Sequence, residues 1–439
     1  MAVTVIELND SELRVARNGE IVLRSPGYAV VKPDRIEVGE KALSIARLNP
    51  RETHNRYWTH LNQDALAVPS RLARHHADLA FTHLLDIHEK AGKPDEVIFA
   101  VPGSYSNEQL SLLLGIVEAC PFNAIGLVDS AVASAAAVAG SGGFTHIEIF
   151  LHHTILTHLE VTDTVSRKSV QVIEDCGLTD IYDACANLIS DLFIEQSRFD
   201  PQHHGETEQQ LYDQIPRCLQ NLQDGGEVLM EIQYQDTRHQ IKLFRDVLLS
   251  SLDKFYQRVL NSLPADNALM IGNRLSQLPD FGRQFDQAGF IQANAVFQGC
   301  QQHLAEIAPS GQGVSFVTRL PATSTPLVPA RPRADQTAAT AAMNRAARVT
   351  HILHNHQAYP LTDEWIYLSA DAGISPDRNE NSHCSVLLKN RLARVRPESE
   401  LTVFINGQRI KSDTTAGPGD TLTFAGSDTV YRFINVRDA

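Results

Sequence analysis

The sequence predicts an α/β protein with a separate all-β domain towards its C-terminal end. In residues 97–139, strand-like apolar runs alternate with helix-like segments, a pattern typical of a largely parallel sheet covered by helices. After the glycine-rich residues 140–143 a second series of strands and helices begins, so we expect two halves of similar architecture. Beyond a stretch rich in Pro, Ala and Thr, residues 349–436 carry strand and turn signals with almost no helical periodicity.

These breaks predict three parts: an α/β domain over residues 1–318, a linker over 319–342 and an all-β domain over 343–439. The linker contains several Thr and Ser residues that are candidates for phosphorylation, although an unmodified tether is the simpler interpretation. They are Thr323, Ser324, Thr325, Thr337 and Thr340.

The first half begins with a strand meander, because the turn-forming pairs Asn9-Asp10 and Asn18-Gly19 separate short apolar runs. Asn107 is a good N-cap for the second helix, and the third is rich in alanine. In order, the strands are Val3–Leu8, Leu13–Ala16, Ile21–Leu23, Glu96–Val101 and Ile125–Val128, and the helices are Pro69–Ala91, Asn107–Ala119 and Ser130–Ala139.

The second half repeats the order of strands followed by helices, although no sequence repeat is visible. Its expected strands are His146–Leu151, Ile155–Val161, Val228–Tyr234, His239–Leu243 and Ala268–Ile271. Its expected helices are Asp180–Arg198, Thr207–Asn221, Phe244–Leu263 and Ala293–Ile307.

Composition narrows the function class. The 439 residues carry a formal net charge of −14, which argues against a nucleic-acid or anionic-membrane partner, since both favour a basic face. The six cysteines form no CxxC pair and indicate buried free thiols in a reducing compartment. We see no signal peptide, and the small apolar stretch Ala131–Gly140 is too short for a bilayer span. We therefore expect a soluble cytoplasmic protein.

Residues 97–139, VIFAVPGSYSNEQLSLLLGIVEACPFNAIGLVDSAVASAAAVA, resemble the seventy-kilodalton heat-shock chaperones. Those proteins have a strand ending in VP, a helix opening with N/D-x-x-Q, a further strand and an alanine-rich helix. The resemblance extends over Val3–Ile307 through Arg35–Pro50 (RIEVGEKALSIARLNP), Ala268–Pro279 (ALMIGNRLSQLP) and Phe290–Leu304. It implies a duplicated actin-like (ribonuclease-H-like) ATPase fold.

An ATPase of this family grips phosphate with two glycine-rich hairpins, because only glycine lets the backbone approach so closely. The first family motif, D-x-G-T, matches Glu7–Asp10, which lacks both the glycine and the threonine. The second, D-x-G-G-G-T, matches Phe150–Thr154, where histidines replace glycines and phenylalanine replaces the metal-binding aspartate. The resemblance assigns a residual nucleotide cleft to Glu7, Asn9, Asp10, Asp129 and Gly272.

These losses predict a non-catalytic, chaperone-like scaffold or adaptor that binds protein partners, with no catalytic residue and no cofactor. Self-association is a further possibility. The alternative is a nucleotide-regulated ATPase or switch that uses ATP and Mg²⁺, with Glu7, Asp10, Asp129 and Gly272 in altered roles. A third interpretation is that Asp129 merely caps the following helix and that Asn9-Asp10-Ser11 is only a stable turn.

The C-terminal part resembles forkhead-associated domains, on the segments THILHNHQAYPLTDEWIYLS, SHCSV, LTVFINGQRI and PGDTLTF. The resemblance implies a β-sandwich whose partner-binding motif retains His383, Asn406 and Gly407. The arginine and serine that hold phosphothreonine in the family are replaced here, at Ser369-Ala370 and Glu380. A phosphoprotein-binding module is therefore the remaining alternative for this part.

The histidines suggest metal binding, since imidazole is a common zinc ligand. On a strand, His152 and His158 would share one face. No Cys or carboxylate completes a ligand set at suitable spacing, so no metal is expected. The histidines considered are His146, His152, His153 and His158, and in the C-terminal part His351, His354 and His356.

Overall fold

A computed structural model describes residues 3–322 and 349–434, except for short gaps. The gaps lie at residues 67, 69, 139, 224, 265–266, 286–287, 310–312, 355–356, 363, 371–372, 380–381, 390–391, 399–401, 407, 411–412, 417–418, 426 and 428. The chain divides into two compact units, Met1–Ala330 and Arg331–Ala439. None of the helices in the described ranges is long and apolar enough to cross a lipid bilayer.

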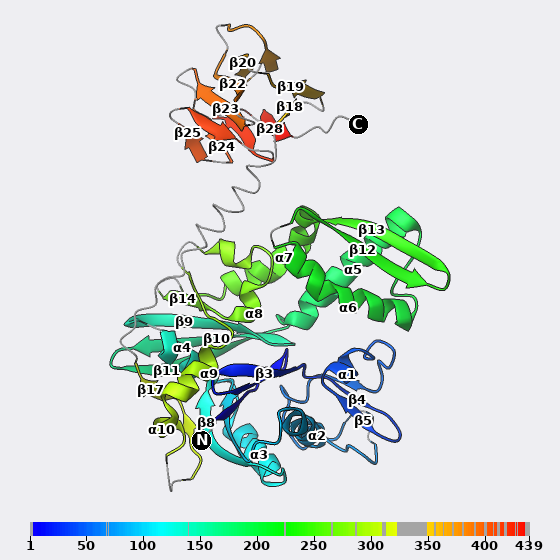
Figure 1. Cartoon of the computed structure of the whole chain (residues 1–439), viewed down its shortest axis with the longest axis vertical. Coiled ribbons are helices and arrows are strands. Elements are labelled where there is room, and N and C mark those ends of the chain that lie inside the picture. The colour runs from blue at the N-terminus through cyan, green and yellow to red at the C-terminus, as the bar shows by residue number, and fades with distance from the viewer. Residues whose placement is uncertain are drawn as a thin grey trace. The chain divides into compact units, whose positions relative to one another are not determined.

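The first unit is mixed α/β, as the sequence predicts, and its first large sheet has the strand order β16-β8-β7-β1-β2-β3 (Figure 1). The strands β1 to β3 form the predicted antiparallel meander, whereas β1, β7, β8 and β16 run parallel. The sheet is therefore mixed rather than largely parallel. Its strands are β1 (Thr4–Glu7), β2 (Leu13–Arg17), β3 (Glu20–Ser25), β7 (Glu96–Val101), β8 (Asn123–Asp129) and β16 (Phe316–Val317).

The second large sheet has the order β15-β14-β9-β10-β11-β17. Its five strands from β9 to β15 repeat the first sheet: three consecutive antiparallel strands, then two strands added parallel to the first of them. The members are β9 (Gly142–Ile149), β10 (His153–Val161), β11 (Thr164–Glu174), β14 (Ala268–Ile271), β15 (Ala288–Phe290) and β17 (Arg319–Pro321).

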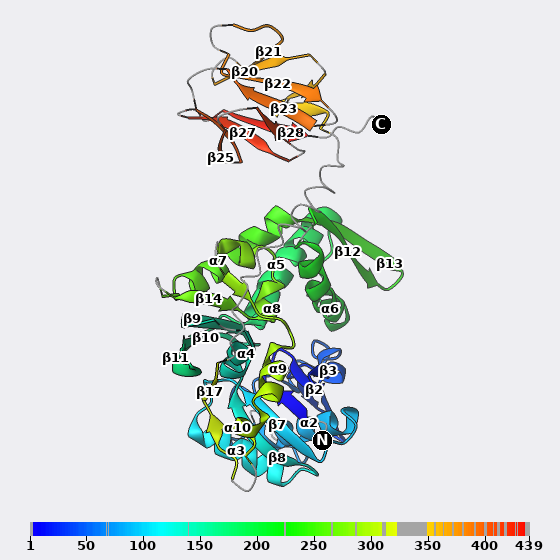
Figure 2. The same ribbon diagram turned by 60° about the vertical axis from the view of Figure 1, so that its left-hand side comes forward.

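Helices cover the outer faces of both sheets and also lie between them. In Figures 1 and 2, α2 and α3 lie on the side of the first sheet that points away from the second sheet. Helices α5, α6 and α7 lie on the side of the second sheet that points away from the first. The helices are α1 (Glu40–Leu43), α2 (His76–Lys90), α3 (Asn107–Glu118), α4 (Ser130–Val138), α5 (Leu178–Ser197), α6 (Gly205–Asn221), α7 (Arg245–Leu260), α8 (Asn273–Ser276), α9 (Ala295–Gln302), α10 (Leu304–Ile307) and the 3₁₀ turn Phe281–Gln284.

Two small sheets complete the first unit. One consists of β4 (Ala29–Val31), β5 (Ile36–Val38) and β6 (Thr53–His54) in the order β5-β4-β6. The other is the two-stranded ribbon of β12 (Glu227–Tyr234) and β13 (Thr237–Phe244), and both of its strands were predicted.

The alanine-rich helix α4 packs against α9 in the core between the two large sheets. This core combines Val5 and Ile98 of the first sheet with Leu159 and Val165 of the second. The helices approach so closely that a Cβ atom at Gly299 would lie 1.9 Å from the backbone oxygen of Ala133. The small side chains of α4 thus let two helices and two sheets share one apolar core.

Residues Phe316–Pro321, which we call the strap, join the two large sheets. The strap contributes β16 parallel to β8 and, after the single residue Thr318, β17 antiparallel to β11. The linker predicted from residue 319 therefore starts too early, because Arg319–Pro321 belongs to a sheet and Leu320 is buried. Residues 323–342 lie outside the described part of the chain.

Two predicted helix starts also need correction. The N-cap of α3 is Ser106, whose hydroxyl accepts a hydrogen bond from Gln109 N at 3.3 Å, and Asn107 is the first helical residue. Helix α2 begins at His76 rather than near Pro69, and Asp78 accepts from the backbone N of Arg74 and His75 at this start.

The second unit is all-β, with two sheets around one core. The core contains Ile352, Val386, Val403 and Phe433. The sheet orders are β19-β18-β28-β27-β24-β25 and β21-β20-β22-β23-β26. The strands are β18 (His351–His354), β19 (Gln357–Pro360), β20 (Ile366–Ser369), β21 (Gly373–Ser375), β22 (Cys384–Lys389), β23 (Leu392–Pro397), β24 (Val403–Ile405), β25 (Gln408–Ile410), β26 (Thr414–Ala416), β27 (Thr421–Phe424) and β28 (Val430–Ile434).

Candidate functional site

The predicted cleft residues lie at strand ends in the middle of the first unit. Glu7 ends β1, Asn9 and Asp10 form the following turn, and Gly272 directly follows β14. Asp129 ends β8, two strands away from Glu7 in the sheet order. The fold thus brings Glu7 and Gly272 to one centre, with Asn9 and Asp10 in the turn that follows Glu7, and leaves Asp129 in a separate contact.

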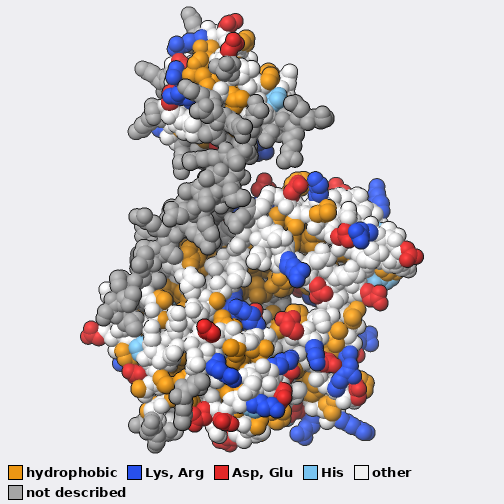
Figure 3. Space-filling model, viewed as in Figure 1, with side chains coloured by type: hydrophobic (Ala, Val, Ile, Leu, Met, Phe, Trp, Pro, Cys, Tyr) orange, Lys and Arg blue, Asp and Glu red, His pale blue; other side chains and the backbone are white. Residues whose placement is uncertain are grey.

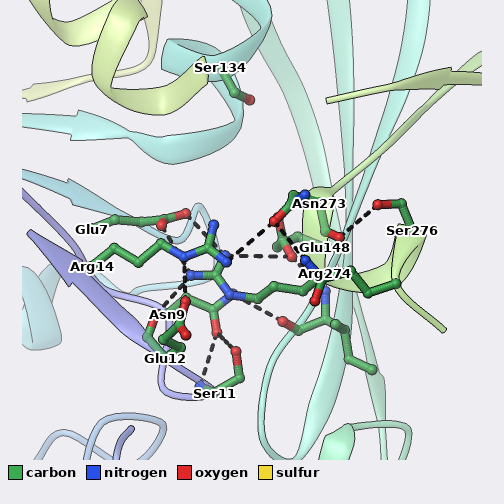
Figure 4. A network of polar contacts seen from close by, with 12 residues as sticks. Glu7, Asn9, Ser11, Glu12, Arg14, Ser134, Glu148, Asn273, Arg274 and Ser276 are labelled. Carbon is green, nitrogen blue, oxygen red and sulfur yellow. Dashed lines mark hydrogen bonds and ion pairs between the residues drawn. The ribbon is translucent and has the colours of Figure 1, made fainter. Parts of the chain in front are cut away.

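The centre is occupied by Arg274 of α8, a residue that the sequence prediction did not name (Figure 4). Its guanidinium donates to both carboxylate oxygens of Glu7, at 3.3 and 3.1 Å, and to the backbone oxygen of Glu12 at 2.8 Å. It also lies 3.7 Å from the carboxylate of Glu148. Arg274 is only 7% exposed and Glu7 5%, so this ion pair is buried.

The charged groups in this cluster shift one another's pKa values. Burial lowers the pKa of Arg274, but the carboxylates of Glu7 and Glu148 outweigh that effect and raise its pKa above the ordinary value. Burial raises the pKa of Glu148 to about 7, against the opposing effect of Arg274. Glu148 therefore titrates near neutrality beside the Glu7–Arg274 ion pair.

Gly272 has a steric role beside this cluster. A Cβ atom at residue 272 would lie 2.3 Å from a carboxylate oxygen of Glu148, so only glycine leaves that side chain its present position. The backbone N of Gly272 donates to Ile147 O at 2.8 Å.

The two hairpins that would hold phosphates are joined directly to each other. The Asn9 side-chain amide donates to Ile149 O at 3.0 Å, and Leu151 N donates to Asp10 Oδ1 at 2.8 Å. The other oxygen of Asp10 accepts from the hydroxyl of Thr59 at 2.6 Å. Asn9 also accepts from the backbone N and hydroxyl of Ser11, which makes the turn self-supporting.

The N-terminus of α5 is also occupied from within. Leu178 N donates to Phe150 O at 2.9 Å, and Thr179 N donates to Leu151 O at 2.8 Å. The first N–H groups of a helix are a ready anion site when they are free. Here the carbonyls of the second hairpin take these two donors.

His152 and His153 fill the second hairpin. His152 Nε2 lies 3.1 Å from Asn55 O, and the ring of His153 stacks on Phe150 at a centroid distance of 4.9 Å. Burial lowers the pKa of both histidines. His152 lies in the turn before β10, so it does not share a strand face with His158 as predicted.

Asp129 caps α4 and pairs across the two sheets. Its Oδ1 accepts from the backbone N of Ala131 at 2.9 Å and of Val132 at 3.2 Å. Its Oδ2 accepts from Arg167 of β11 at 2.8 Å, and Arg167 also donates to Gly103 O at 3.1 Å. The capping interpretation of Asp129 is thereby confirmed.

A buried Ser–His pair lies elsewhere in the first unit, between Ser25 and His83, 2.7 Å apart. The indole N–H of Trp58 lies 3.1 Å from His83 Nδ1 and can only donate, so Nδ1 is the acceptor. The neutral ring therefore carries its proton on Nε2 and donates it to Ser25. A histidine in this tautomer cannot take a proton from the serine, so the pair is structural.

The other histidines considered as metal ligands lie beside hydroxyl groups or an aromatic ring, where the structure describes them. His146 lies 3.4 Å from Ser134 Oγ, and His158 lies 3.0 Å from Thr145 Oγ1. Nowhere in the described ranges do three His, Cys, Asp or Glu side chains come together in an arrangement that could hold a metal ion. His351 lies 3.0 Å from Thr350, His354 stacks on Tyr431, and His356 is outside the described residues.

In the second unit the predicted partner-binding residues are tied into the sandwich. His383 Nδ1 accepts from Ala370 N at 3.2 Å. Asn406 donates to Asp420 at 2.8 Å and accepts from Thr421 N at 2.9 Å, with a φ of 51° at the turn. Gly407 and Glu380 lie outside the described residues.

Two cavities lie next to the two hydrogen-bonded hairpins. One, of about 140 Å³, includes Asp10, Tyr105 and His153 in its wall. The other, of about 280 Å³, has four arginines in its wall and was not predicted. We call it the arginine-lined cavity; its residues are Ser11, Glu12, Arg14, Arg24, Leu178, Tyr182, Pro216, Arg217, Leu219, Gln220, Arg274, Gln277 and Leu278.

Comparison of the chain with models of known protein families and with curated proteins finds no match. The chemistry of the site therefore has to be inferred from its geometry. The arrangement holds carboxylates in ion pairs and hairpins in mutual hydrogen bonds, and it leaves the arginine-lined cavity beside them.

Proposed function

We propose that the first unit is a duplicated actin-like fold that does not hydrolyse ATP and acts as a chaperone-like scaffold or adaptor for protein partners. The shared strand order of its two large sheets supports the duplication. The alanine-rich helix between these sheets, in the segment that resembles the heat-shock chaperones, agrees with the same fold.

The observation that carries the proposal is the direct hydrogen bond between the hairpins, from Leu151 N to the Asp10 carboxylate. A triphosphate held between two hairpins needs their N–H groups to face the phosphates. Here the neighbouring hairpin takes one of those donors, and the α5 N–H groups are bonded to Phe150 and Leu151. The bond to the Asp10 carboxylate is charge-assisted and contributes about 1.5–3 kcal/mol, and the two backbone bonds of α5 contribute about 0.5–1.5 kcal/mol each, so nucleotide would have to replace all three.

The carboxylates of Glu7 and Asp10 are also bound to other groups of the protein. Hydrated Mg²⁺ requires one or two carboxylates that are free to face it. Glu7 is paired with Arg274, and Asp10 accepts from Leu151 N and Thr59. A metal ion at this place would meet the positive charge of Arg274. This favours the scaffold over a nucleotide-regulated switch.

The second unit would supply another binding surface. Its two-sheet sandwich agrees with the resemblance to forkhead-associated domains. His383 and Asn406 serve internal hydrogen bonds, so we propose that they shape this unit rather than touch a phosphorylated partner.

Phosphate release from ATP, measured on the full chain with Mg²⁺ and with EDTA, tests the first part of the proposal. We expect the same background rate in both conditions and in the Asp10→Asn variant. Turnover that requires Mg²⁺ and falls in Asp10→Asn would contradict the proposal and support the nucleotide-regulated alternative.

Partner retention tests the adaptor role. Proteins captured by the full chain are identified, purified and titrated against it with and without MgATP. We expect a one-to-one complex whose dissociation constant is unchanged by nucleotide. A complex that forms or dissolves only with MgATP would favour the switch instead.

A further inference from the structure

The arginine-lined cavity lies between elements of both halves of the first unit. Arg14 and Arg24 come from β2 and β3, Arg217 from α6 and Arg274 from α8. On the face seen in Figure 3, basic, acidic and hydrophobic side chains surround a hollow near the middle of this unit. Four arginines around one cavity are unusual in a chain whose net charge is −14.

Counting ion pairs shows how much positive charge remains there. Arg274 is paired with Glu7 and also lies 3.7 Å from the carboxylate of Glu148, which is partly ionised at neutral pH because burial raises its pKa to about 7. Arg14 and Arg24 share the single carboxylate of Glu12, which leaves one charge in excess. Arg217 has no ion-pair partner among the residues whose placement is described, which leaves a second. The four arginines thus exceed the carboxylates Glu7, Glu12 and partly ionised Glu148 by about one to two positive charges.

The arginines also crowd one another. Burial and the neighbouring charge of Arg274 lower the pKa of Arg14. Arg14 is only 3% exposed, and the Nε atom of Arg274 is buried with no hydrogen-bond partner in the described residues. An anion in the cavity would relieve this repulsion and would offer acceptors to planar guanidinium groups.

Part of the wall is apolar. Leu178 and Tyr182 of α5, Pro216 and Leu219 of α6, and Leu278 after α8 line it beside the arginines. Sites for small organic ligands usually combine an apolar wall with a few placed polar groups. At about 280 Å³ the cavity suits a compact molecule.

We propose that the arginine-lined cavity binds a small organic phosphate monoester, a dianion with a compact apolar body, without a metal ion. The phosphate charge compensates the excess positive charge of the arginines, and the apolar body lies against α5 and α6. A carboxylate would supply one charge and two acceptor oxygens, whereas a phosphate monoester supplies up to two charges and three acceptor oxygens for the guanidinium groups. The site is independent of the scaffold proposal, since it requires neither ATP hydrolysis nor Mg²⁺.

Calorimetric titration of the full chain in EDTA at low ionic strength tests this, with phenyl phosphate as the probe. We expect one site per chain, weaker binding of inorganic phosphate and no binding of phenol. Arg217→Ala should weaken phenyl phosphate binding about tenfold or more, since one charge-assisted contact is lost. Arg24→Ala should weaken it as well.

Arg238→Ala is the matched control, because Arg238 is an exposed arginine on β13 outside the cavity. It should bind phenyl phosphate like the original chain. The proposal is overturned by equal binding to Arg217→Ala and Arg238→Ala, by no detectable binding at millimolar probe, or by binding that requires Mg²⁺. None of these results depends on whether ATP is hydrolysed, so the two proposals fail separately.

Discussion

The Arg274 side chain shows how a buried charge can hold two sheets together. It reaches from α8, beside the second sheet, to Glu7 at the end of β1 in the first. Breaking a buried ion pair by removing one partner costs about 3–5 kcal/mol, because the other charge is left uncompensated. The pair therefore resists replacement of either residue alone, whatever its net contribution to stability.

Gly272→Ala tests the packing around this cluster. The added Cβ would meet the Glu148 carboxylate at 2.3 Å, so we expect the free energy of unfolding to fall by about 1–3 kcal/mol. Chemical denaturation measures it. Gly115→Ala in α3 is the control, because nothing lies within 4 Å of its Cβ position. That change should stabilise the helix slightly, and an equal loss in both variants would refute the explanation.

The burial of His83 makes the free energy of unfolding depend on pH. Burial lowers its pKa from the ordinary 6.5 to about 3, so the unfolded chain binds a proton that the folded chain excludes. The stability that the neutral His83 contributes is fully present above pH 6.5. As the pH falls from 6.5 towards 3, this group lowers the free energy of unfolding by up to about 1.4 kcal/mol per pH unit.

Denaturation curves of the original chain and His83→Gln between pH 7 and 4.5 measure this effect. The variant should lose less stability over that interval, because one titrating group is gone. Parallel curves would show that His83 is not the group responsible. The difference between the two proteins is needed because other groups, among them His146 and Glu148, titrate in the same range.

At the scale of elements, the β12–β13 ribbon is protected at one edge by helix side chains. Gln210 of α6 bonds both the backbone O and the backbone N of Gln233, at 2.9 and 3.0 Å. Gln214, one turn later, bonds the backbone O and N of Glu231 in the same way. Two carboxamides thus take the place of a neighbouring strand, which covers an edge that could otherwise pair with another chain.

Replacing both glutamines, as Gln210→Ala with Gln214→Ala, should expose this edge. We expect the amide hydrogens of Glu231 and Gln233 to exchange with solvent roughly tenfold faster, as for the loss of one hydrogen bond each. Hydrogen exchange read by NMR gives the rates residue by residue. Gln220→Ala on the same helix is the control, and uniform acceleration throughout the first unit would point to general destabilisation instead.

Elements with a local signal could be predicted from the sequence. The segment from β7 to α4 was placed within a few residues, because apolar runs, a proline-glycine turn and a helix cap all act locally. Strand β11 was missed because Thr164–Glu174 contains SRKSVQ, in which polar and charged residues hide the alternation. Its pairing with β10 supplies what local propensity lacks.

The centre of the site could be predicted only in part. Glu7, Asn9, Asp10 and Gly272 follow from the motif positions. Arg274 stood in the quoted motif ALMIGNRLSQLP, but its partner Glu7 lies 267 residues away, and spacing alone does not pair them. The arginine-lined cavity takes residues from β2, β3, α5, α6 and α8, so it exists only after folding.

At the scale of the whole first unit, the strap decides where the unit can be cut. A fragment ending at residue 318 lacks β17 and the buried Leu320, whereas one ending at residue 330 retains both. Burying a leucine contributes about 1.5–3 kcal/mol, and the hydrogen bonds of β17 add to this.

We therefore expect fragment 1–318 to unfold at a lower denaturant concentration than fragment 1–330. The unfolding midpoint of the longer fragment should equal that of the first unit in the full chain. Equal midpoints for the two fragments would mean that β17 contributes nothing to the first unit. Leu320→Ala in the full chain should cost about 2–5 kcal/mol and checks that the loss comes from this contact.

The strap also bears on the order of events during synthesis. Its six residues emerge after every other strand of both large sheets, yet they need β8 on one side and β11 on the other before they can pair. A half-finished first unit offers only one of these partners. The strap can therefore pair on both sides only when β8 and β11, one from each half, have already formed. The C-terminal sandwich is synthesised after the strap.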